Sequence, residues 1–194
     1  MKIKTYIDMV NTLGENSKCT RKQVGAILLR NDRIISTGYN GLPSGSDDTV
    51  CKEGCTGCKL TVHAEMNAIL FAAKEGVSTQ GSDLYVNYSP CLNCAKHIIN
   101  AGIRAVYFLE MYDKPEGIQA LNLLAQYCDV YQLKMGEGEW YEEEITTLMA
   151  LKTKLRTKAT TQAPYPEKAT LSEVEIEELA TIMANSIWEA IRNE

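Results

Sequence analysis

Four side chains in the middle of the sequence have the types and spacing needed to hold a metal ion and use it. His63 offers an imidazole nitrogen, and Cys91 and Cys94 offer two thiolates, which together make three ligands for a tetrahedral zinc ion. A zinc ion with three protein ligands keeps its fourth position for water and lowers the pKa of that water to about 7. Glu65 is close enough in sequence to reach such a water and exchange protons with it. These residues predict a hydrolytic zinc site.

The spacing of the two cysteines favours a helix that begins beside the metal. Cys91 and Cys94 are three residues apart, so on a helix they share one face. Pro90 directly precedes them, and proline is favoured near helix starts, where the helix dipole also stabilises thiolates. For the cysteines alone, a closed structural zinc site and a buried pair of thiols stay open as alternatives. A purely structural site, however, has no use for the carboxylate of Glu65.

The composition is that of a globular protein. The chain has 194 residues, which suits one domain or one domain with an extension, and 45% of them are hydrophobic. No apolar run approaches the roughly 18 residues that span a bilayer, and the N-terminus lacks signal-peptide features. We therefore expect a cytoplasmic protein, in the host cytoplasm if the gene is viral, with no membrane partner. The net charge of −5 argues against a broad nucleic-acid-binding surface.

Hydrophobic periodicity predicts alternating helices and strands up to residue 136. Helices are expected over residues 2–16, 62–75, 91–101 and 116–127. Strands are expected over residues 23–30, 33–39, 83–88, 104–110 and 129–135. This order predicts a three-layer α/β domain over residues 1–136, with a central mixed sheet of five strands flanked by helices. It also brings His63, Cys91 and Cys94 together at adjacent helix N-termini.

The character of the sequence changes after about residue 137. We expect a helix from Glu142 to about Lys158, a linker over about 158–169, and a second helix over 171–192. Residues 137–194 are therefore expected to form a helical C-terminal extension. Its last helix carries an apolar stripe, which predicts packing on its own domain or on a neighbouring subunit. The second arrangement would make the protein a homo-oligomer.

Several segments resemble the deoxycytidylate (dCMP) deaminases, with the bacterial and phage branch as the nearest relatives. The main segments are Val24-Gly25-Ala26, Ile34-Ile35-Ser36-Thr37-Gly38-Tyr39-Asn40-Gly41, His63-Ala64-Glu65-Met66-Asn67-Ala68-Ile69 and Ser89-Pro90-Cys91-Leu92-Asn93-Cys94-Ala95-Lys96. The H-x-E and P-C-x-x-C elements within them are the zinc deaminase signature. The resemblance covers roughly residues 5–135 and leaves the C-terminal portion outside. It implies the cytidine-deaminase-like fold.

The resemblance implies hydrolysis of dCMP to dUMP and ammonia, which supplies dUMP for thymidylate synthesis. Glu65 would shuttle protons between the zinc-activated water and the cytosine ring. The implied substrate contacts are Asn40, Ala64, Ser89, Pro90 and Tyr112. On position alone Asn40 suits an ordinary turn, whereas the resemblance implies that it contacts the deoxyribose. For the 5′-phosphate, charge alone indicates Arg21, Lys22 and Arg104.

The resemblance also implies regulation and a second metal. Family members are commonly hexamers that dCTP activates and dTTP inhibits, with Mg²⁺ accompanying the triphosphate. On this chain the corresponding effector residues would be Gly38, Tyr39, Gly41, Asn67, Phe71 and Lys74, although Phe71 is equally consistent with a core aromatic. Phage and bacterial members often carry a structural zinc ion as well. Four of the seven cysteines, Cys19, Cys51, Cys55 and Cys58, offer thiolates for it, with free thiols in a loop as the alternative.

Other functions remain compatible with these residues. The substrate could be dCTP, both dCMP and dCTP, or a 5-modified cytosine nucleotide, because the sequence does not display the phosphate contacts. A nucleic-acid deaminase is disfavoured by the acidic balance and the absence of a basic tail. A catalytically silent zinc- or nucleotide-binding regulatory module is disfavoured by Glu65, for which such a module has no need.

Overall fold

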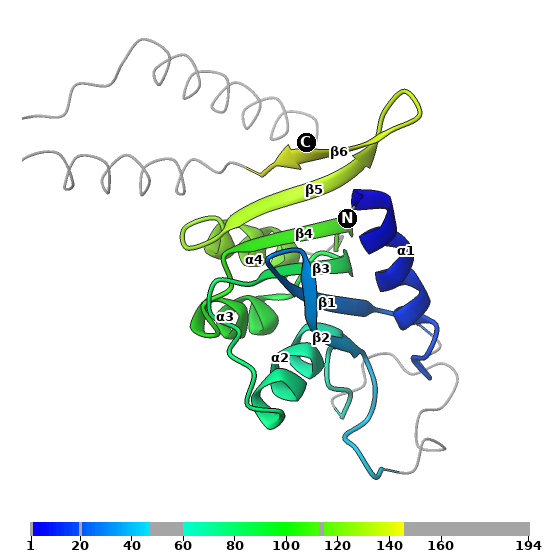
Figure 1. Ribbon diagram of the computed structural model, residues 1–194, viewed down its shortest axis with the longest axis vertical. Helices are drawn as coiled ribbons and strands as arrows, with labels where there is room; N and C mark the ends of the chain where they lie inside the picture. Colours follow the sequence, from blue (N-terminus) through cyan, green and yellow to red (C-terminus); the bar gives the residue numbers. More distant parts are fainter. Residues whose placement is uncertain (1, 20, 47–59, 113–114, 146–194) are drawn as a thin grey trace, which may run out of the picture. The chain divides into compact units, whose positions relative to one another are not determined.

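The computed structural model describes residues 2–19, 21–46, 60–112 and 115–145, and all statements about structure concern these ranges (Figure 1). The elements in chain order are α1 (Ile3–Gly14), β1 (Gly25–Arg30), β2 (Arg33–Tyr39), α2 (Ala64–Lys74), β3 (Asp83–Tyr88), α3 (Leu92–Asn100), β4 (Ala105–Glu110), α4 (Pro115–Leu124), β5 (Asp129–Met135) and β6 (Trp140–Glu144). None of these helices is long and apolar enough to cross a membrane. The predicted α/β class is confirmed.

The strands form one mixed sheet in the order β2-β1-β3-β4-β5-β6. Strands β3, β4 and β5 run parallel, whereas β1 pairs antiparallel with both β2 and β3, and β6 pairs antiparallel with β5. Parallel neighbours need a crossover connection, and α3 and α4 provide the two that this sheet requires. The carboxyl ends of β3 and β4 therefore meet at one edge of the sheet, where α3 begins.

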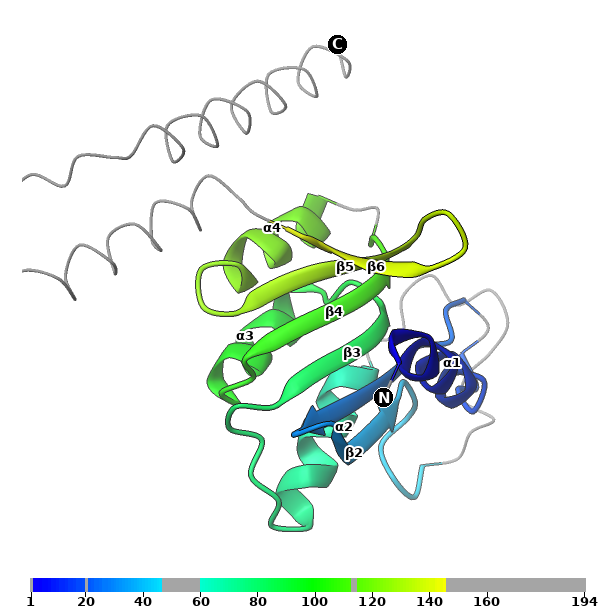
Figure 2. The same cartoon turned by 45° about the horizontal axis from the view of Figure 1, so that its top comes forward.

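Helices cover both faces of the sheet, which makes three layers (Figure 2). Helix α1 lies on one face, where Tyr6, Ile7 and Val10 pack against Ile27 and Tyr85 in a buried cluster. Helices α2, α3 and α4 lie on the other face. The sequence periodicity that predicted α1 and α3 matches these packing faces, because their buried residues recur every three or four positions.

Helix α2 approaches the sheet unusually closely, and small residues make this approach feasible. Ala64, Ala68 and Ala72 form its buried face. Across from them on β2, a Cβ atom added to Gly38 would lie 2.3 Å from the carbonyl oxygen of Ala64 and 2.5 Å from the nitrogen of Ala68. Only glycine fits there. The closeness matters for function because α2 carries His63 at its start and Glu65 in its first turn.

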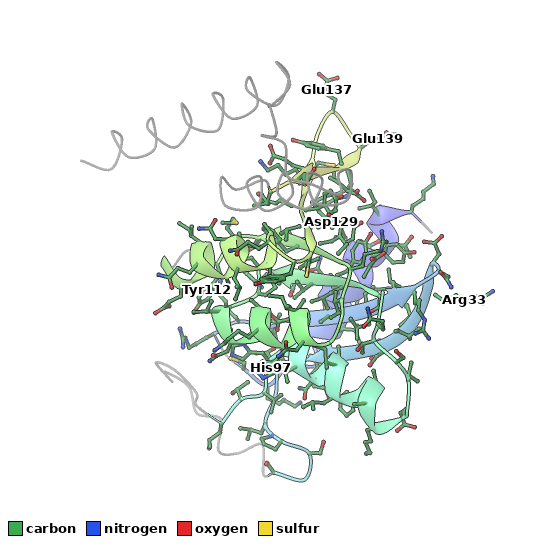
Figure 3. The ribbon with its side chains drawn as sticks, turned by 90° about the vertical axis from the view of Figure 1, so that its left-hand side faces the viewer. Arg33, His97, Tyr112, Asp129, Glu137 and Glu139 are labelled. Carbon is green, nitrogen blue, oxygen red and sulfur yellow. The ribbon has the colours of Figure 1, made fainter. Side chains whose placement is uncertain are left out.

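The two ends of the central strands, here called the two edges of the sheet, differ in the residues that gather there. Figure 3 shows Tyr112, which follows β4, at one side of the domain and Arg33, at the tip of the β1–β2 hairpin, at the opposite side. The first edge also holds the starts of α2 and α3. The second edge holds the ion pair between Arg104 and Asp83, at 2.6 Å. The predicted chemistry belongs to the Tyr112 edge.

Two expectations about the end of the domain are wrong. The sheet has six strands rather than five, and Glu142, Glu143 and Glu144 lie in β6 rather than opening a helix. Three consecutive acidic residues suit a helix start, but pairing with the free edge of β5 outweighs that preference. The compact unit runs from Met1 to Ile145, so the boundary expected at residue 136 falls inside the β5–β6 hairpin. The helices and linker expected after residue 145 lie outside the described residues.

Candidate active site

His63 lies at the N-cap of α2, directly before the first helical residue. Its backbone is extended, with φ −72° and ψ 156°, and its side chain makes no capping bond, so the ring is not used by its own helix. An isolated antiparallel bridge between Gly41 and Val62 fixes the position of the residue just before His63, with N···O distances of 3.1 and 2.8 Å. The end of β2 therefore positions the residue that begins α2.

Cys91 occupies the equivalent position in α3. It is the N-cap, with φ −76° and ψ 167°, and Cys94 lies in the first turn. Ser89 fixes the preceding turn, because its backbone N–H donates to the carbonyl of Glu110 at 2.8 Å and its hydroxyl accepts from the N–H of Tyr112 at 2.7 Å. The carboxyl ends of β3 and β4 are thereby tied together directly behind the two cysteines.

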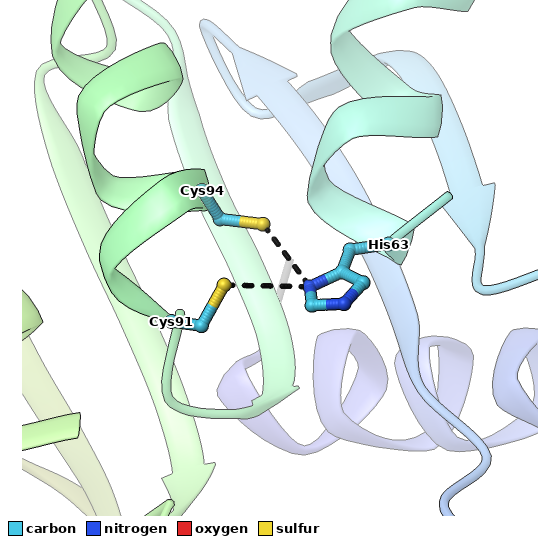
Figure 4. Close-up of side chains that lie close together, drawn as sticks. All are labelled: His63, Cys91 and Cys94. Carbon is cyan, nitrogen blue, oxygen red and sulfur yellow. Dashed lines mark hydrogen bonds between the residues drawn. The ribbon is translucent and has the colours of Figure 1, made fainter. Parts of the chain in front are cut away.

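The three side chains converge in the geometry of a zinc site (Figure 4). The Sγ atoms of Cys91 and Cys94 lie 3.5 and 3.4 Å from Nδ1 of His63, and the ligand atoms of the cluster all lie within 4.8 Å of one another. Tetrahedral zinc, with bonds of about 2.0 Å to nitrogen and about 2.3 Å to sulfur, places these atoms roughly 3.5 Å apart. The donor set and its spacing therefore fit zinc bound through Nδ1. Three protein ligands leave the fourth position for water or substrate.

The electrostatics of the metal-free cluster are those of an ion pair. Hydrogen bonding from Cys94, together with His63, lowers the pKa of Cys91 to about 3, so its thiol is ionised at neutral pH. The hydrogen bond with Cys91 raises the pKa of His63 to about 9 despite burial of the ring. The Cys94 thiol, bonded to Cys91 and buried, has its pKa raised and stays protonated. Two of the three donors must lose a proton to bind a metal.

Glu65 lies in the first turn of α2 with only 4% of its surface exposed. Burial raises the pKa of this carboxyl above its ordinary value, because the charged form is desolvated. Both Glu65 and His63 line a cavity of about 240 Å³ that also reaches Cys91. A buried carboxyl with a raised pKa, beside a site for a metal-activated water, has the properties of a general acid and base.

The residues expected to contact substrate are mostly placed in this cavity. Asn40, Ala64, Ser89 and Tyr112 line it, whereas Pro90 does not and is fully buried beside it. Asn40 is 6% exposed, and both ends of its side-chain amide bond the backbone of the segment before β1. Asn40 is therefore more than an ordinary turn residue, because its side chain organises a neighbouring segment.

The residues expected to bind an effector divide into two groups. Tyr39, Gly41, Asn67 and Phe71 line a second cavity, of about 270 Å³, on the outer side of α2. Phe71 is 41% exposed there, so the reading of it as a core aromatic is wrong. Gly38 and Lys74 do not line this cavity: Gly38 packs against the backbone of α2, and Lys74 lies exposed in the last turn of that helix.

The four thiols expected to bind a second zinc ion are only partly described. Cys19 lines both the cavity of His63 and the second cavity. Cys51, Cys55 and Cys58 lie outside the described residues. Within the described ranges, the cluster of His63, Cys91 and Cys94 is the single group of side chains arranged to hold a metal.

The three cations proposed for the phosphate are separated by the structure. Arg21 and Lys22 line the cavity of His63. Arg104 precedes β4 and pairs with Asp83 at 2.6 Å, at the amino ends of the parallel strands, so its assignment to the phosphate is wrong. Charge alone could not separate the three. Each of them precedes a strand, and they lie at opposite ends of the sheet because β1 runs antiparallel to β3 and β4.

Asn87 is a buried polar residue that the sequence reasoning missed; it does not line the cavity of His63 but bonds the segment that leads into β1. It lies in β3, is 8% exposed, and uses its side-chain amide to bond the backbone of Gln23 and Gly25. A polar residue in an otherwise apolar and aromatic strand was the available signal. Burial of an amide is tolerated only when its hydrogen bonds are satisfied, so such a residue indicates a specific partner.

Comparisons with known proteins identify the family. Residues 1–110 match the cytidine and deoxycytidylate deaminase zinc-binding region. The chain is 46% identical over 111 residues to ComE operon protein 2 of Bacillus subtilis, a match that covers 55% of this chain and 58% of that protein. It is 35% identical over 155 residues to the deoxycytidylate deaminase of Enterobacteria phage T2, covering 59% of this chain and 82% of the phage protein.

A solved structure shows the same architecture. The dCMP deaminase of cyanophage S-TIM5, in complex with dCMP and dUMP, superposes with a TM-score of 0.59 at 33% identity, over 68% of this chain and 98% of that one. This likeness agrees with the predicted cytidine-deaminase-like fold. The chain therefore belongs to the cytidine and deoxycytidylate deaminase family of zinc-dependent enzymes, which hydrolyse C–N bonds.

Proposed function

We propose that the protein catalyses the hydrolytic deamination of dCMP to dUMP and ammonia. One observation carries the proposal: a buried carboxyl, Glu65, shares a small cavity with the His63, Cys91 and Cys94 cluster. The deoxycytidylate deaminases to which the chain is similar, and the cyanophage enzyme that binds dCMP and dUMP, support this choice of substrate. The product dUMP would serve thymidylate synthesis.

The reaction needs a nucleophile at C4 of cytosine and proton transfers at two positions. When bound, zinc supplies a water whose pKa lies near 7. Glu65 would take one proton from the attacking water and deliver it to N3 of the ring. It would then take the second proton from the hydroxyl group at C4 and deliver it to the amine, which leaves as ammonia while the C4 carbonyl forms. One water is consumed and one ammonia is released. Burial of Glu65, which raises its pKa, suits both directions of transfer.

The cavity provides for the sugar as well. Asn40 and Tyr112 line the same cavity and are our candidates for contacts with the deoxyribose and base. Ala64 and Ser89 complete the wall near His63. Lys22 and Arg21 are the cations that line this cavity in the described part of the chain, and they are our candidates for the phosphate.

Regulation and assembly extend the same proposal. The second cavity, with Tyr39, Asn67 and Phe71, is our candidate site for dCTP as activator and dTTP as inhibitor, each with Mg²⁺. We further propose a homo-oligomer, a hexamer as in the family, with residues 146–194 as a helical extension that contacts a neighbouring subunit. A structural zinc on Cys19, Cys51, Cys55 and Cys58, and a cytoplasmic location, complete the proposal.

A substrate panel tests the proposed reaction. Ammonia release is measured on dCMP, dCTP, deoxycytidine and single-stranded DNA, each with and without dCTP or dTTP and Mg²⁺. We expect turnover of dCMP, little on deoxycytidine and none on DNA, with dCTP raising and dTTP lowering the rate. Faster turnover of dCTP or of a 5-modified nucleotide would replace dCMP as substrate. No turnover of any cytosine compound by the zinc-loaded protein would favour a silent binding module instead.

A further inference from the structure

The segment that leads into β1 is held by side-chain amides where the sheet ends. The ladder between β1 and β2 ends at the pair Gly25–Tyr39, and the ladder between β1 and β3 ends at Ala26–Val86. The next residue along each partner strand is an asparagine, Asn40 or Asn87. Both asparagines turn their amides onto residues 22–25, which continue the line of β1 beyond the sheet.

The hydrogen bonds of the two amides alternate along this segment. Asn40 donates from Nδ2 to the carbonyl of Lys22 at 2.9 Å and accepts at Oδ1 from the N–H of Val24 at 2.8 Å. Asn87 donates from Nδ2 to the carbonyl of Gln23 at 3.0 Å and accepts at Oδ1 from the N–H of Gly25 at 3.1 Å. Four successive residues are thus each bonded by one amide atom, from two sides.

Such an arrangement depends on the amide group itself. Each side chain supplies one donor and one acceptor at a fixed spacing, as a backbone peptide does. A carboxylate has no donor, and an aliphatic side chain has neither. Both amides are buried, so a donor or acceptor left without its partner would destabilise the fold. The pair therefore fixes residues 22–25 more tightly than a loop entering a strand requires.

The charged side chain that this segment presents to the active site is that of Lys22, beside Val24, which also lines the cavity. Its Nζ lies 3.9 Å from the centre of the Tyr88 ring and 5.4 Å from that of Tyr112. Lys22 lines the cavity that contains His63 and Glu65, and it also lines a larger cavity of about 840 Å³ on the α1 side of the sheet. A lysine held over two aromatic faces loses less conformational freedom on binding an anion than an unsupported surface lysine.

We propose that Lys22 recognises the 5′-phosphate of the nucleotide and that Asn87, with Asn40, is a positioning residue that acts through Lys22. This inference rests on the proposed deamination of a nucleotide. Arg21 lies outside the bonded segment and is exposed, whereas Lys22 is half-buried and lies inside it. Lys22, whose position is fixed by the two amides, therefore provides the selectivity for a nucleotide over a nucleoside.

The test is a double-mutant cycle on Lys22→Met and Asn87→Ala. The quantity measured is the phosphate preference, which is kcat/KM on dCMP divided by kcat/KM on deoxycytidine. Because hydrogen bonds to charged groups contribute about 1.5–3 kcal/mol, Lys22→Met should lower the preference roughly 10- to 100-fold. Asn87→Ala should lower it about 10-fold, mainly through KM for dCMP, and should leave deoxycytidine within about 3-fold of the unsubstituted protein. In the Lys22→Met background, Asn87→Ala should change the preference no further.

Binding measurements give a second readout that needs no turnover. Calorimetric titration of the zinc-loaded variants with dUMP and with deoxyuridine measures the two affinities. The affinity for dUMP should fall by the same factors as the phosphate preference, whereas the affinity for deoxyuridine should not change. Lys4→Met is the matched control, because it removes one positive charge from the exposed side of α1, where Lys4 pairs with Asp8. Lys22→Arg should retain most of the preference, since it keeps the charge.

Three results would overturn the inference. An unchanged preference in Lys22→Met would remove Lys22 from phosphate recognition. Equal losses for dCMP and deoxycytidine in Asn87→Ala would reduce Asn87 to a structural residue, as would additive losses in the double variant. If the unsubstituted protein turns over neither compound yet binds dUMP more tightly than deoxyuridine in a Lys22-dependent way, the proposed reaction fails while this phosphate site stands.

Discussion

His63 and Cys91 hold the same position in two different helices: each is an N-cap, and Sγ of Cys91 lies 3.5 Å from Nδ1 of His63. Neither side chain caps its own helix, so both are available to a metal. Two helix N-termini point at the cluster, and the partial positive charge of each favours the ionised thiolates. The geometry of the metal site therefore depends on how the segments at the ends of β2 and β3 position the first residues of α2 and α3.

Replacement of Glu65 by glutamine should separate zinc binding from catalysis. Glu65→Gln keeps the shape of the side chain but cannot accept or deliver the proton. General acid–base groups contribute about 10²–10⁴-fold, so we expect kcat on dCMP to fall by at least ~10³-fold while zinc remains at one or more ions per chain. Ammonia release and elemental analysis measure the two quantities. Full activity in this variant would remove Glu65 from the mechanism.

The same substitution should raise stability in a pH-dependent way. Burial raises the pKa of Glu65 in the folded state above its unfolded value, so ionising this group costs folding free energy as pH rises through the folded pKa. Glutamine has no such cost. We therefore expect a higher Tm for metal-free Glu65→Gln than for the metal-free unsubstituted protein at pH 8. The difference should shrink as the pH falls below about 4.3, the ordinary pKa of glutamate, because the carboxyl becomes protonated in both states. A difference that grows as pH falls would contradict the assignment of the shift.

The metal ligands could be predicted from sequence because their signal is local. A proline before two cysteines three apart, and a histidine two residues before a glutamate, report helix starts and donor types without knowledge of the fold. Arg104, Asn87 and β6 required the fold itself. Arg104 and Lys22 both precede a strand, and only the opposite directions of β1 and β4 place them at opposite ends of the sheet. The partners of Asn87 lie more than 60 residues away in sequence. The preference of three glutamates for a helix start was outweighed by pairing with the edge of β5.

Zinc binding to the metal-free protein should release about two protons at pH 7. In the metal-free state His63, with its pKa raised to about 9, and Cys94, with its pKa also raised, are protonated, whereas Cys91, with its pKa lowered to about 3, is not. All three must be deprotonated to bind the metal. Zinc affinity should therefore rise about 100-fold per pH unit between pH 5 and 8. Calorimetry in two buffers of different ionisation enthalpy counts the protons, and a release of none or one would contradict the ion-pair description.

Gly38 should be needed for the position of α2 rather than for effector binding directly. In Gly38→Ala the added Cβ would meet the carbonyl of Ala64 and the nitrogen of Ala68, both backbone atoms that cannot give way alone. We expect a loss of about 3 kcal/mol or more in unfolding free energy, and weaker zinc binding because His63 precedes Ala64. Denaturant unfolding and competition with a chelator measure these.

Gly76→Ala is the matched control for this substitution. Gly76 has φ +68° and open space around it, so an added methyl group meets no other atom. The only cost to the unfolding free energy is that of holding an alanine in the left-handed backbone conformation, about 1–2 kcal/mol. It lies at the other end of α2, after Lys74, and should leave zinc affinity unchanged. Equal losses of stability and zinc affinity in the two variants would show that the closeness of β2 to α2 does not set the position of His63.

The end of the folded domain should lie at residue 145 rather than 136. Strand β6 pairs with β5 from Trp140 to Glu144, and Trp140 packs on the cluster beneath α1. A chain ending at residue 136 loses these contacts and exposes the edge of β5, so we expect it to unfold about 2–5 kcal/mol more easily and to aggregate. A chain ending at residue 145 should melt as the full chain does, and a smaller mass in light scattering would assign residues 146–194 to subunit contacts. Equal melting of both shortened chains would return the boundary to residue 136.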